Sequence, residues 1–294
     1  MSTLQALQPS PTSPTHFSPF ASAALGKPRP CIRVAGVSFD DVTMPEAVER
    51  IAQMARNTDH ARHVCTGNLD HLTMLESDSA FRAAYDSADL VLADGMPVVW
   101  LSRLDKTQPP LRERVAGSDL FFELGALSAR TDLRLFFLGG APGAASRAAA
   151  VLRKKYPDVC VADTYCPDFA TFGTPEEEAR ITERVQSARP HILLVGLGAP
   201  KQEKWILANK DRLGVPLSVG VGGSFEMAAG MVKRAPVWMQ KTGLEWCHRM
   251  MQEPGRLTKR YMGRDLPFLL KLLWRTARPV RQSRAMYESG RVNL

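Results

Sequence analysis

Cysteines are few and scattered in this chain of 294 residues. The five of them form neither a CxxC pair nor the spacing of a zinc site. An odd, dispersed set predicts free thiols in a reducing compartment, not a disulfide framework. HExxH is also missing, as is an Asp-x-Asp sequence at the end of a predicted strand, so the sequence predicts neither a metal site nor a bound cofactor.

Long apolar runs are missing as well. None reaches the ~18–20 residues that a membrane-spanning helix requires. Residues 1–30 hold six prolines and only two charged side chains. This composition predicts a disordered extension and not a secretory signal, because prolines interrupt the apolar positions and a charged start is missing.

Neither of two common glycine-rich nucleotide motifs is present. Residues 36–41 do not supply the G-x-G-x-x-G of a dinucleotide fold, which counts against the alternative of a redox or non-catalytic nucleotide-binding module. The loop from Gly139 to Gly143 lacks the Gly-Lys-Ser/Thr of a Walker loop. Gly139 and Gly140 nevertheless precede a predicted helix, so this loop either receives a diphosphate or only lets the helix pack tightly on its strand.

Acidic residues are scarce in one part of the chain. Residues 231–294 contain fourteen Lys and Arg against four Asp and Glu, a balance of +10 within a net charge of +8, which leaves −2 for residues 1–230. A basic tail predicts an anionic membrane surface, a phosphorylated substrate or nucleic acid as partner, and the acidic balance of the core argues against nucleic acid. The apolar block Leu266–Trp274 is too short to span a bilayer. The excess of basic residues and the Trp274-Arg275 border favour a position in a membrane interface, and the alternative is a helix packed on the core or on a second copy of the chain.

What is present is a regular alternation of predicted strands and helices. Strands are expected at Ile32–Phe39, His63–Thr66, Leu90–Ala93, Leu133–Leu138, Val159–Ala162, Ile192–Val195 and Leu217–Val221. Helices are expected over Pro45–Arg56, Leu72–Ser87, Gly117–Ser128 and Pro175–Ala188. Two more are expected, one from the loop Gly139–Gly143 to Lys155 and one from Lys201 onwards. The alternation predicts a doubly wound, mostly parallel, Rossmann-like α/β sheet over residues 31–230, with a helical basic C-terminal appendage over residues 231–294.

Polar residues stand at the ends of several predicted strands. Thr66 and Asn68 follow one strand and Asp94 follows another. Because the carboxyl ends of parallel strands meet at one edge of a sheet, these side chains are expected to share a ligand-binding crevice. Asp94 is the best candidate for a base, since the glycine after it leaves room for a substrate and partial burial makes a carboxylate a stronger proton acceptor. The alternative is that Asp94 only caps a helix.

The turn after Ile192–Val195 is a second candidate site. Gly198 shapes this turn, and Lys201 and Gln202 open the helix that follows. A helix that starts there points free backbone N–H groups at an anion. The alternative is an ordinary strand-to-helix turn with solvated charges.

Three arginines of the tail are candidates for phosphate binding. Arg249, Arg256 and Arg260 lie at i, i+7 and i+11, which is one face of a continuous helix, although Pro254 interrupts the pattern. They supply cations for a phosphorylated substrate, or they are solvated surface arginines.

Several of these stretches together resemble the WecG/TagA/CpsF family of bacterial glycosyltransferases over about residues 32–265. The N-terminal part of the resemblance rests on Thr66-Gly67-Asn68, Ala93-Asp94-Gly95-Met96-Pro97, Arg114-Val115-Ala116-Gly117-Ser118-Asp119-Leu120 and Phe137-Leu138-Gly139-Gly140. The rest is carried by Val195-Gly196-Leu197-Gly198-Ala199-Pro200-Lys201-Gln202-Glu203, Gly220-Val221-Gly222-Gly223-Ser224-Phe225, Arg234-Ala235-Pro236, Gly243-Leu244-Glu245-Trp246, Arg249 and Glu253-Pro254-Gly255-Arg256.

The resemblance implies transfer of a sugar from a UDP-sugar to a polyprenyl-diphosphate-linked saccharide at the cytoplasmic face of the membrane. Similar N-acetylmannosaminyltransferases invert the anomeric centre and use no metal. The implied partners are therefore a UDP-sugar, a lipid-linked acceptor and an anionic membrane surface, for a peripheral protein of exopolysaccharide, common-antigen or teichoic-acid-type synthesis.

The same resemblance implies roles for individual residues. Asp94 matches the family's catalytic base, Thr66 and Asn68 match a T-x-N that lines the pocket, and Gln202 matches a glutamine near the nucleotide sugar. The donor diphosphate is then expected beside Gly139-Gly140 and the Gly198–Lys201 turn.

The family's appendage carries arginines that enter the site at the membrane. Arg249, Arg256 and Arg260 fall in the matching segment, with Arg256 and Arg260 expected to offset charge on the departing UDP. The sequence departs from the family at Phe225-Glu226, where Phe-Asp is usual, and the match around Thr164–Pro167 is loose. These departures leave the donor sugar open among N-acetylmannosamine, its uronic acid, glucose and glucuronic acid.

Overall fold

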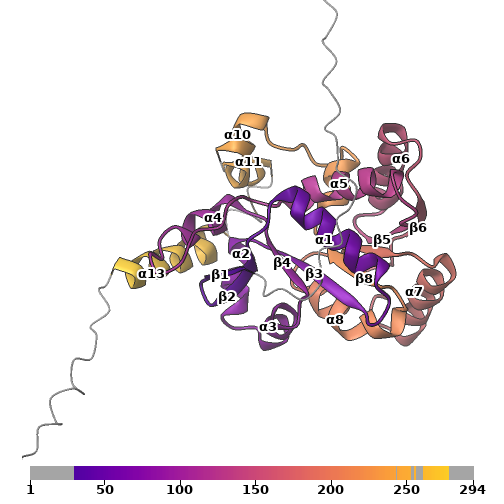
Figure 1. Ribbon diagram of the computed structural model, residues 1–294, viewed down its shortest axis with the longest axis horizontal. Helices are drawn as coiled ribbons and strands as arrows, with labels where there is room; N and C mark the ends of the chain where they lie inside the picture. The colour runs from indigo at the N-terminus through magenta and orange to yellow at the C-terminus, as the bar shows by residue number, and fades with distance from the viewer. Residues whose placement is uncertain (1–29, 243, 253–254, 256–260, 278–294) are drawn as a thin grey trace, which may run out of the picture.

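The computed structural model describes residues 30–242, 244–252, 255 and 261–277 (Figure 1). The predicted extension over residues 1–30 therefore lies almost wholly outside the described residues, and so do Arg256 and Arg260.

A six-stranded parallel sheet forms the centre of the protein, with the strand order β4-β3-β8-β7-β5-β6. Its strands are β3 (Arg62–Gly67), β4 (Leu90–Ala93), β5 (Leu135–Gly139), β6 (Val161–Tyr165), β7 (Ile192–Gly196) and β8 (Leu217–Gly220). After β3 and β4 the chain crosses to the other end of the sheet, where β5 and β6 lie, and β7 and β8 then fill the middle. This strand order confirms the predicted doubly wound α/β sheet. It also places β3, β4 and β8, which are distant in sequence, side by side.

Helices cover both faces of this sheet (Figure 1). One face carries α1 (Met44–Arg56), α5 (Gly117–Ala129) and α6 (Ala144–Lys155), and the other carries α3 (Ser79–Asp86), α7 (Pro175–Ala188) and α8 (Lys201–Leu213). The side chains of β7 alternate accordingly: Ile192 and Leu194 pack in one cluster, Leu193 and Val195 in the other. Burial on both faces explains why the strands read as unbroken apolar runs.

The stretch predicted as one strand, Ile32–Phe39, is instead an antiparallel hairpin outside the main sheet. It consists of β1 (Cys31–Val34) and β2 (Val37–Asp40), joined at Ala35 and Gly36. Both turn residues have positive φ, 49° and 78°, as a tight hairpin with right-handed twist requires. The apolar alternation continues on both sides of the turn, and for this reason the prediction of a single strand was wrong.

The helix predicted over Leu72–Ser87 is divided into two. α2 (Leu69–Leu75) ends before Asp78, whose side chain accepts a hydrogen bond of 3.0 Å from the amide of Phe81 and thereby caps α3. A short helix that was not predicted, α4 (Met96–Ser102), follows β4 directly. Its proline lies in the first turn, where a missing N–H costs no hydrogen bond.

The described part of the appendage packs against two regions of the core. α10 (Val237–Lys241) and α11 (Glu245–Gln252) follow α9 (Ser224–Ala228), and the π-helical turn η1 (Tyr261–Asp265) leads into α13 (Leu266–Ala277). Phe268 of α13 is buried in the cluster that α2, α4 and the hairpin share. Lys271 pairs with Glu76 at 3.0 Å, and Arg264 pairs with Asp70. α13 therefore begins as a helix packed on the core beside α4.

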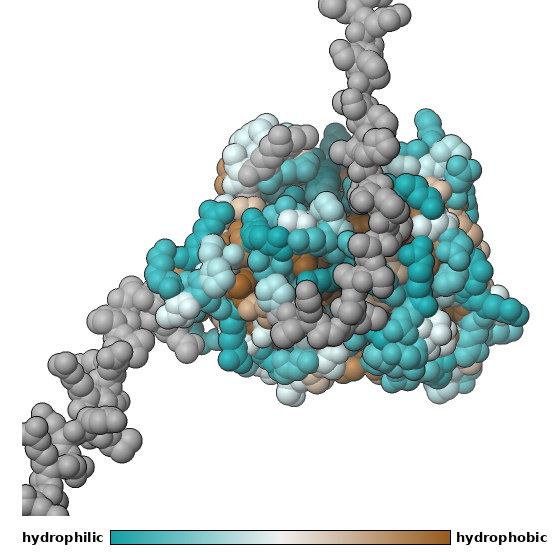
Figure 2. Space-filling model, in the orientation of Figure 1, coloured by the Kyte–Doolittle hydropathy of each residue, from teal (hydrophilic) through white to brown (hydrophobic). Residues whose placement is uncertain are grey.

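Figure 2 shows a face that is mainly hydrophilic, with hydrophobic side chains in small areas between helices. None of the helices in the described ranges combines the length and the apolar character that crossing a membrane requires.

Candidate active site

A cavity of about 460 Å³ opens at the carboxyl ends of β3, β4 and β8. The strand order explains its position, because these three strands are neighbours and their following loops converge. Four of the predicted site residues, Thr66, Asn68, Asp94 and Gln202, line it together. The sequence therefore located residues from three separate chain segments that the fold brings to one cavity.

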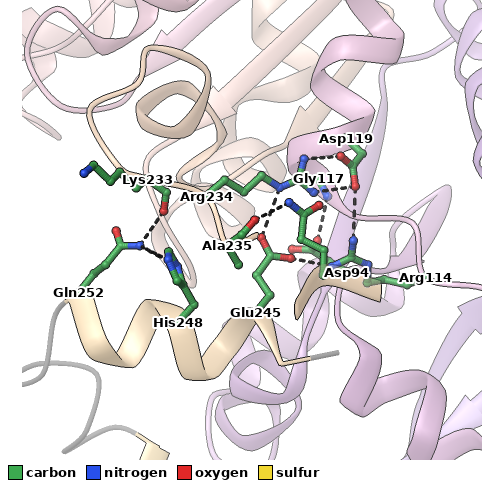
Figure 3. Close-up of polar contacts among 11 residues, drawn as sticks. Asp94, Arg114, Gly117, Asp119, Lys233, Arg234, Ala235, Glu245, His248 and Gln252 are labelled. Carbon is green, nitrogen blue, oxygen red and sulfur yellow. Dashed lines mark hydrogen bonds and ion pairs between the residues drawn. The ribbon is translucent and has the colours of Figure 1, made fainter. Parts of the chain in front are cut away.

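Asp94 follows β4 and is half-buried in the cavity wall. Its backbone N–H donates to the carbonyl of Gly67 at 2.8 Å, which continues the pairing of β3 and β4 beyond the strand. Its Oδ1 accepts a 2.8 Å hydrogen bond from the amide of Gly117, the first residue of α5 (Figure 3). Asp94 thus fixes the start of α5, which comes after α4 in the chain. Gly95, next to Asp94, takes the N-cap position of α4.

Thr66 bonds to the end of β8 and Gln202 to the loop after it. The Thr66 hydroxyl donates to the Gly220 carbonyl at 2.9 Å. Gln202 Oε1 accepts from the amide of Gly222 at 3.0 Å, which fixes which end of its amide faces the loop after β8. A Cβ atom at Gly220 would lie only 2.9 Å from Gln202 Nε2, so a side chain at this position would displace the Gln202 amide.

Gln202 also rests on a buried carboxyl group. Its Nε2 donates to Oε1 of Glu203 at 2.8 Å, and Glu203 has no exposed surface. Burial raises the pKa of Glu203 from 4.5 to about 7. Gln202 in the cavity wall is therefore hydrogen-bonded to a carboxyl group that changes charge near neutral pH.

A network of alternating charges joins this wall to the appendage (Figure 3). Arg234 donates twice to the Asp119 carboxylate, with Nη2 at 2.8 Å from Oδ2, and this pairing raises the pKa of Arg234. Arg114 donates to Glu245 Oε2 at 2.8 Å and lies 3.4 Å from Asp119 Oδ2. Arg234 Nε lies 3.4 Å from Glu245 Oε1, which closes the network. Planar bidentate pairing of this kind fixes direction as well as distance.

Two members of that network, Arg114 and Glu245, line the cavity and were not predicted as site residues. Both lie in stretches that carry the family resemblance, and that was the available signal. Arg114 supplies a half-buried cation close to Asp94, on the segment that leads into α5.

Four other predicted site residues, Gly139, Gly140, Gly198 and Lys201, lie outside this cavity lining. Gly139 ends β5 and Gly140 follows it, both with positive φ, and beside them the amide of Ala141 donates to Glu226 Oε1 at 2.7 Å. Gly198 has a φ of 75° in the turn before α8, and the Lys201 ammonium lies 3.7 Å from the centre of the Phe172 ring. These positions share the carboxyl edge of the sheet with the cavity, and their role in diphosphate binding stays a prediction.

The three predicted arginines are placed only in part. Arg249 lies on α11, which contributes Glu245 and Trp246 to the cavity lining. Arg256 and Arg260 lie outside the described residues. Within the described ranges no three His, Cys, Asp or Glu side chains gather as metal ligands.

A doubly wound sheet, a cavity at its carboxyl edge and a carboxylate in the cavity wall are the features of an α/β protein that binds a ligand at the ends of its strands. The chain belongs to the WecG/TagA/CpsF family of glycosyl transferases, whose family model matches residues 32–282.

Curated relatives with this similarity include the N-acetylglucosaminyldiphosphoundecaprenol N-acetyl-beta-D-mannosaminyltransferases of Staphylococcus aureus strains MW2 and MRSA252. Each is 26% identical to this chain over 255 residues, which covers 86% of this chain and 96% of the relative. The similarity thus extends over the sheet, the cavity and most of the appendage.

Proposed function

We propose that this protein transfers a sugar of the N-acetylmannosamine type from a UDP-sugar to a polyprenyl-diphosphate-linked saccharide, with inversion and without a metal ion. The observation that carries the proposal is the cavity in which Asp94, Thr66 and Gln202 meet, in a chain of this family. The relatives are named for an acceptor that is N-acetylglucosaminyldiphosphoundecaprenol. Because an acceptor of that class is a membrane lipid, we propose that the reaction takes place at the cytoplasmic membrane face, in cell-envelope polysaccharide synthesis.

In the proposed reaction Asp94 removes the proton of the attacking acceptor hydroxyl. The hydroxyl oxygen forms a bond to the anomeric carbon as the bond from that carbon to the UDP oxygen breaks, and UDP leaves with the electron pair. A single displacement of this kind inverts the anomeric centre. The proton ends on Asp94.

Negative charge that develops on UDP requires cations. Arg114 is the cation that lines the cavity, and Arg256 and Arg260 are the proposed supply from the appendage. Entry of the appendage at the membrane would exclude water from the site and so limit hydrolysis of the donor.

The first experiment is a screen of UDP-sugars against a short prenyl-diphosphate-N-acetylglucosamine acceptor, followed by Asp94→Asn. Asparagine retains the oxygen that accepts from Gly117, so the variant should fold, whereas kcat should fall by roughly 100-fold to 10,000-fold because the base is lost.

Asp89→Asn is the matched control. Asp89 precedes β4 as Asp94 follows it, and its Oδ2 likewise accepts from a backbone amide, that of His63 at 3.0 Å. It does not line the cavity, so its kcat should stay near that of the wild type. A normal kcat for Asp94→Asn would exclude Asp94 as the base.

A further inference from the structure

The cavity continues from Asp94 into a channel with apolar walls. One wall is the face of α4 and the turn after it, with side chains at i, i+4 and i+8: Met96, Trp100 and Leu104. The opposite wall comes from η1 and α13, with Met262, Leu266 and Leu269. We call this part of the cavity, between α4 and η1–α13, the apolar channel; Figure 1 shows the helices α4 and α13 side by side.

Charge is nearly absent from these two walls. Asp265 is the one charged residue that the described parts of α4, η1 and α13 contribute to the lining, and it is buried. The charged lining residues Asp70, Asp94, Arg114 and Glu245 all come from other elements. The cavity therefore has a polar end at the carboxyl edge of the sheet and an apolar end beyond it.

The walls of the channel are also unusually exposed for large apolar side chains. Trp100 is 39% exposed, Leu104 37%, Met262 45% and Leu266 40%. By contrast Phe268, on the other side of α13, is 5% exposed and packs in the core. Helix α13 is thus already anchored, and the side chains that face the channel leave apolar surface in contact with water. A contiguous apolar surface of this kind marks a binding site for an apolar ligand.

We propose that the apolar channel binds the first isoprene units of the lipid-linked acceptor, next to its diphosphate. This inference rests on the proposed function, because a prenyl diphosphate is the acceptor class with a hydrocarbon chain joined to a polar head. Met96 and Pro97 follow Asp94 in the chain after a single residue, Gly95. The channel therefore begins where the acceptor's reacting sugar and diphosphate would lie, and it runs along α4 for roughly 10 Å at 1.5 Å per residue.

Chemistry favours a hydrocarbon over the other parts of the two substrates. A nucleobase or a sugar ring presents polar edges that need hydrogen-bond partners when they are buried. Leucine and methionine side chains supply none, and they suit a branched alkene chain that is removed from water. The apolar channel thus distinguishes the acceptor from the donor by hydrophobic contact, separately from any attachment to a bilayer.

The test compares two water-soluble acceptors, the N-acetylglucosamine diphosphates of geraniol and of methanol, with no vesicles present. The wild type should show a KM at least 10-fold lower for the geranyl acceptor. Leu104→Ser and Leu266→Ser should each reduce that preference to less than threefold.

Leu270→Ser is the matched control. Leu270 is one turn beyond Leu266 on the same helix and is 57% exposed, but it does not line the cavity. It should retain the full geranyl preference. An equal loss in Leu266→Ser and Leu270→Ser, or a preference that survives in Leu104→Ser and Leu266→Ser, would overturn the channel.

Geranyl diphosphate alone, titrated by calorimetry without a donor, separates this inference from the proposed function. Binding that Leu266→Ser weakens at least fivefold and Leu270→Ser does not would support the channel even if no sugar were transferred. Transfer to both acceptors with equal KM would refute the channel and leave the proposed function intact.

Discussion

Replacement of Glu203 by glutamine should remove a pH-dependent loss of stability. Glu203 is fully buried beneath Gln202, and its Oε2 has no hydrogen-bond partner among the described residues. Glutamine has nearly the same shape, and its side-chain oxygen can still accept from Gln202 Nε2. The substitution therefore removes the titration and leaves the packing in place.

The magnitude follows from the pKa of the carboxyl group. Unfolding exposes it and returns its pKa from about 7 to 4.5. Between these values the native protein holds a proton that the unfolded chain has released, so the free energy of unfolding falls as pH rises. The full loss above pH 7 is roughly 3 kcal/mol, of which about 2.5 kcal/mol falls between pH 5 and pH 8. The nearby Cys65 thiol and Tyr85 phenol stay neutral in this range, because burial raises the pKa of both well above their usual values.

Urea unfolding followed by circular dichroism at pH 5 and pH 8 measures the effect. Glu203→Gln should be close to the wild type at pH 5 and more stable by roughly 2–3 kcal/mol at pH 8. Glu183→Gln, an exposed site on α7, is the control and should follow the wild type at both values. If the difference between Glu203→Gln and the wild type were the same at both pH values, the buried-carboxyl reasoning would be refuted.

Three further predictions concern the cavity wall, the appendage and the absence of a metal. Gln202→Glu places a second carboxyl group against Glu203, so the variant should unfold at lower temperature than the wild type, and by more at pH 8 than at pH 5, in a thermal melt. Arg234→Met removes the bidentate pair with Asp119 and should cost about 1.5–3 kcal/mol in urea unfolding, whereas Arg234→Lys should recover only part of that loss. Dialysis against EDTA should leave the rate of sugar transfer unchanged, and a loss that added Mg²⁺ restores would contradict the metal-independent proposal.

The parallel sheet was predictable because strands that are buried on both faces have unbroken apolar runs in the sequence. β7, for example, was expected as an unbroken apolar run and lies in the middle of the sheet. The hairpin of β1 and β2 was missed because its turn, at Ala35 and Gly36, falls inside a regular alternation. Backbone conformation at two residues decided that outcome, and hydrophobic patterning carries no information about it.

The position of the cavity was predictable from the sequence, but only some of the residues that line it were. Strand ends are visible in a sequence, and they identified Thr66, Asn68, Asp94 and Gln202. The walls of the apolar channel were not visible in this way. The apolar residues of α4, which begins just after Gly95, have the same pattern in the sequence as residues of the hydrophobic core. Only the three-dimensional position of α13 opposite α4 shows that these side chains face a cavity.

The residues that line the polar end of the cavity also hold the surrounding backbone together. Asp94 bonds to the start of α5, Thr66 to the end of β8, and Gln202 to the loop after β8. Each bond crosses between chain segments that are distant in sequence, so the same side chains that would contact substrate also set the distances between the strand ends. A site built in this way is preorganised, since its polar groups are oriented before a ligand arrives. It follows that alanine at these positions would remove a chemical group and a structural bond at once, and that only near-isosteric substitutions such as Asp94→Asn can separate the two effects.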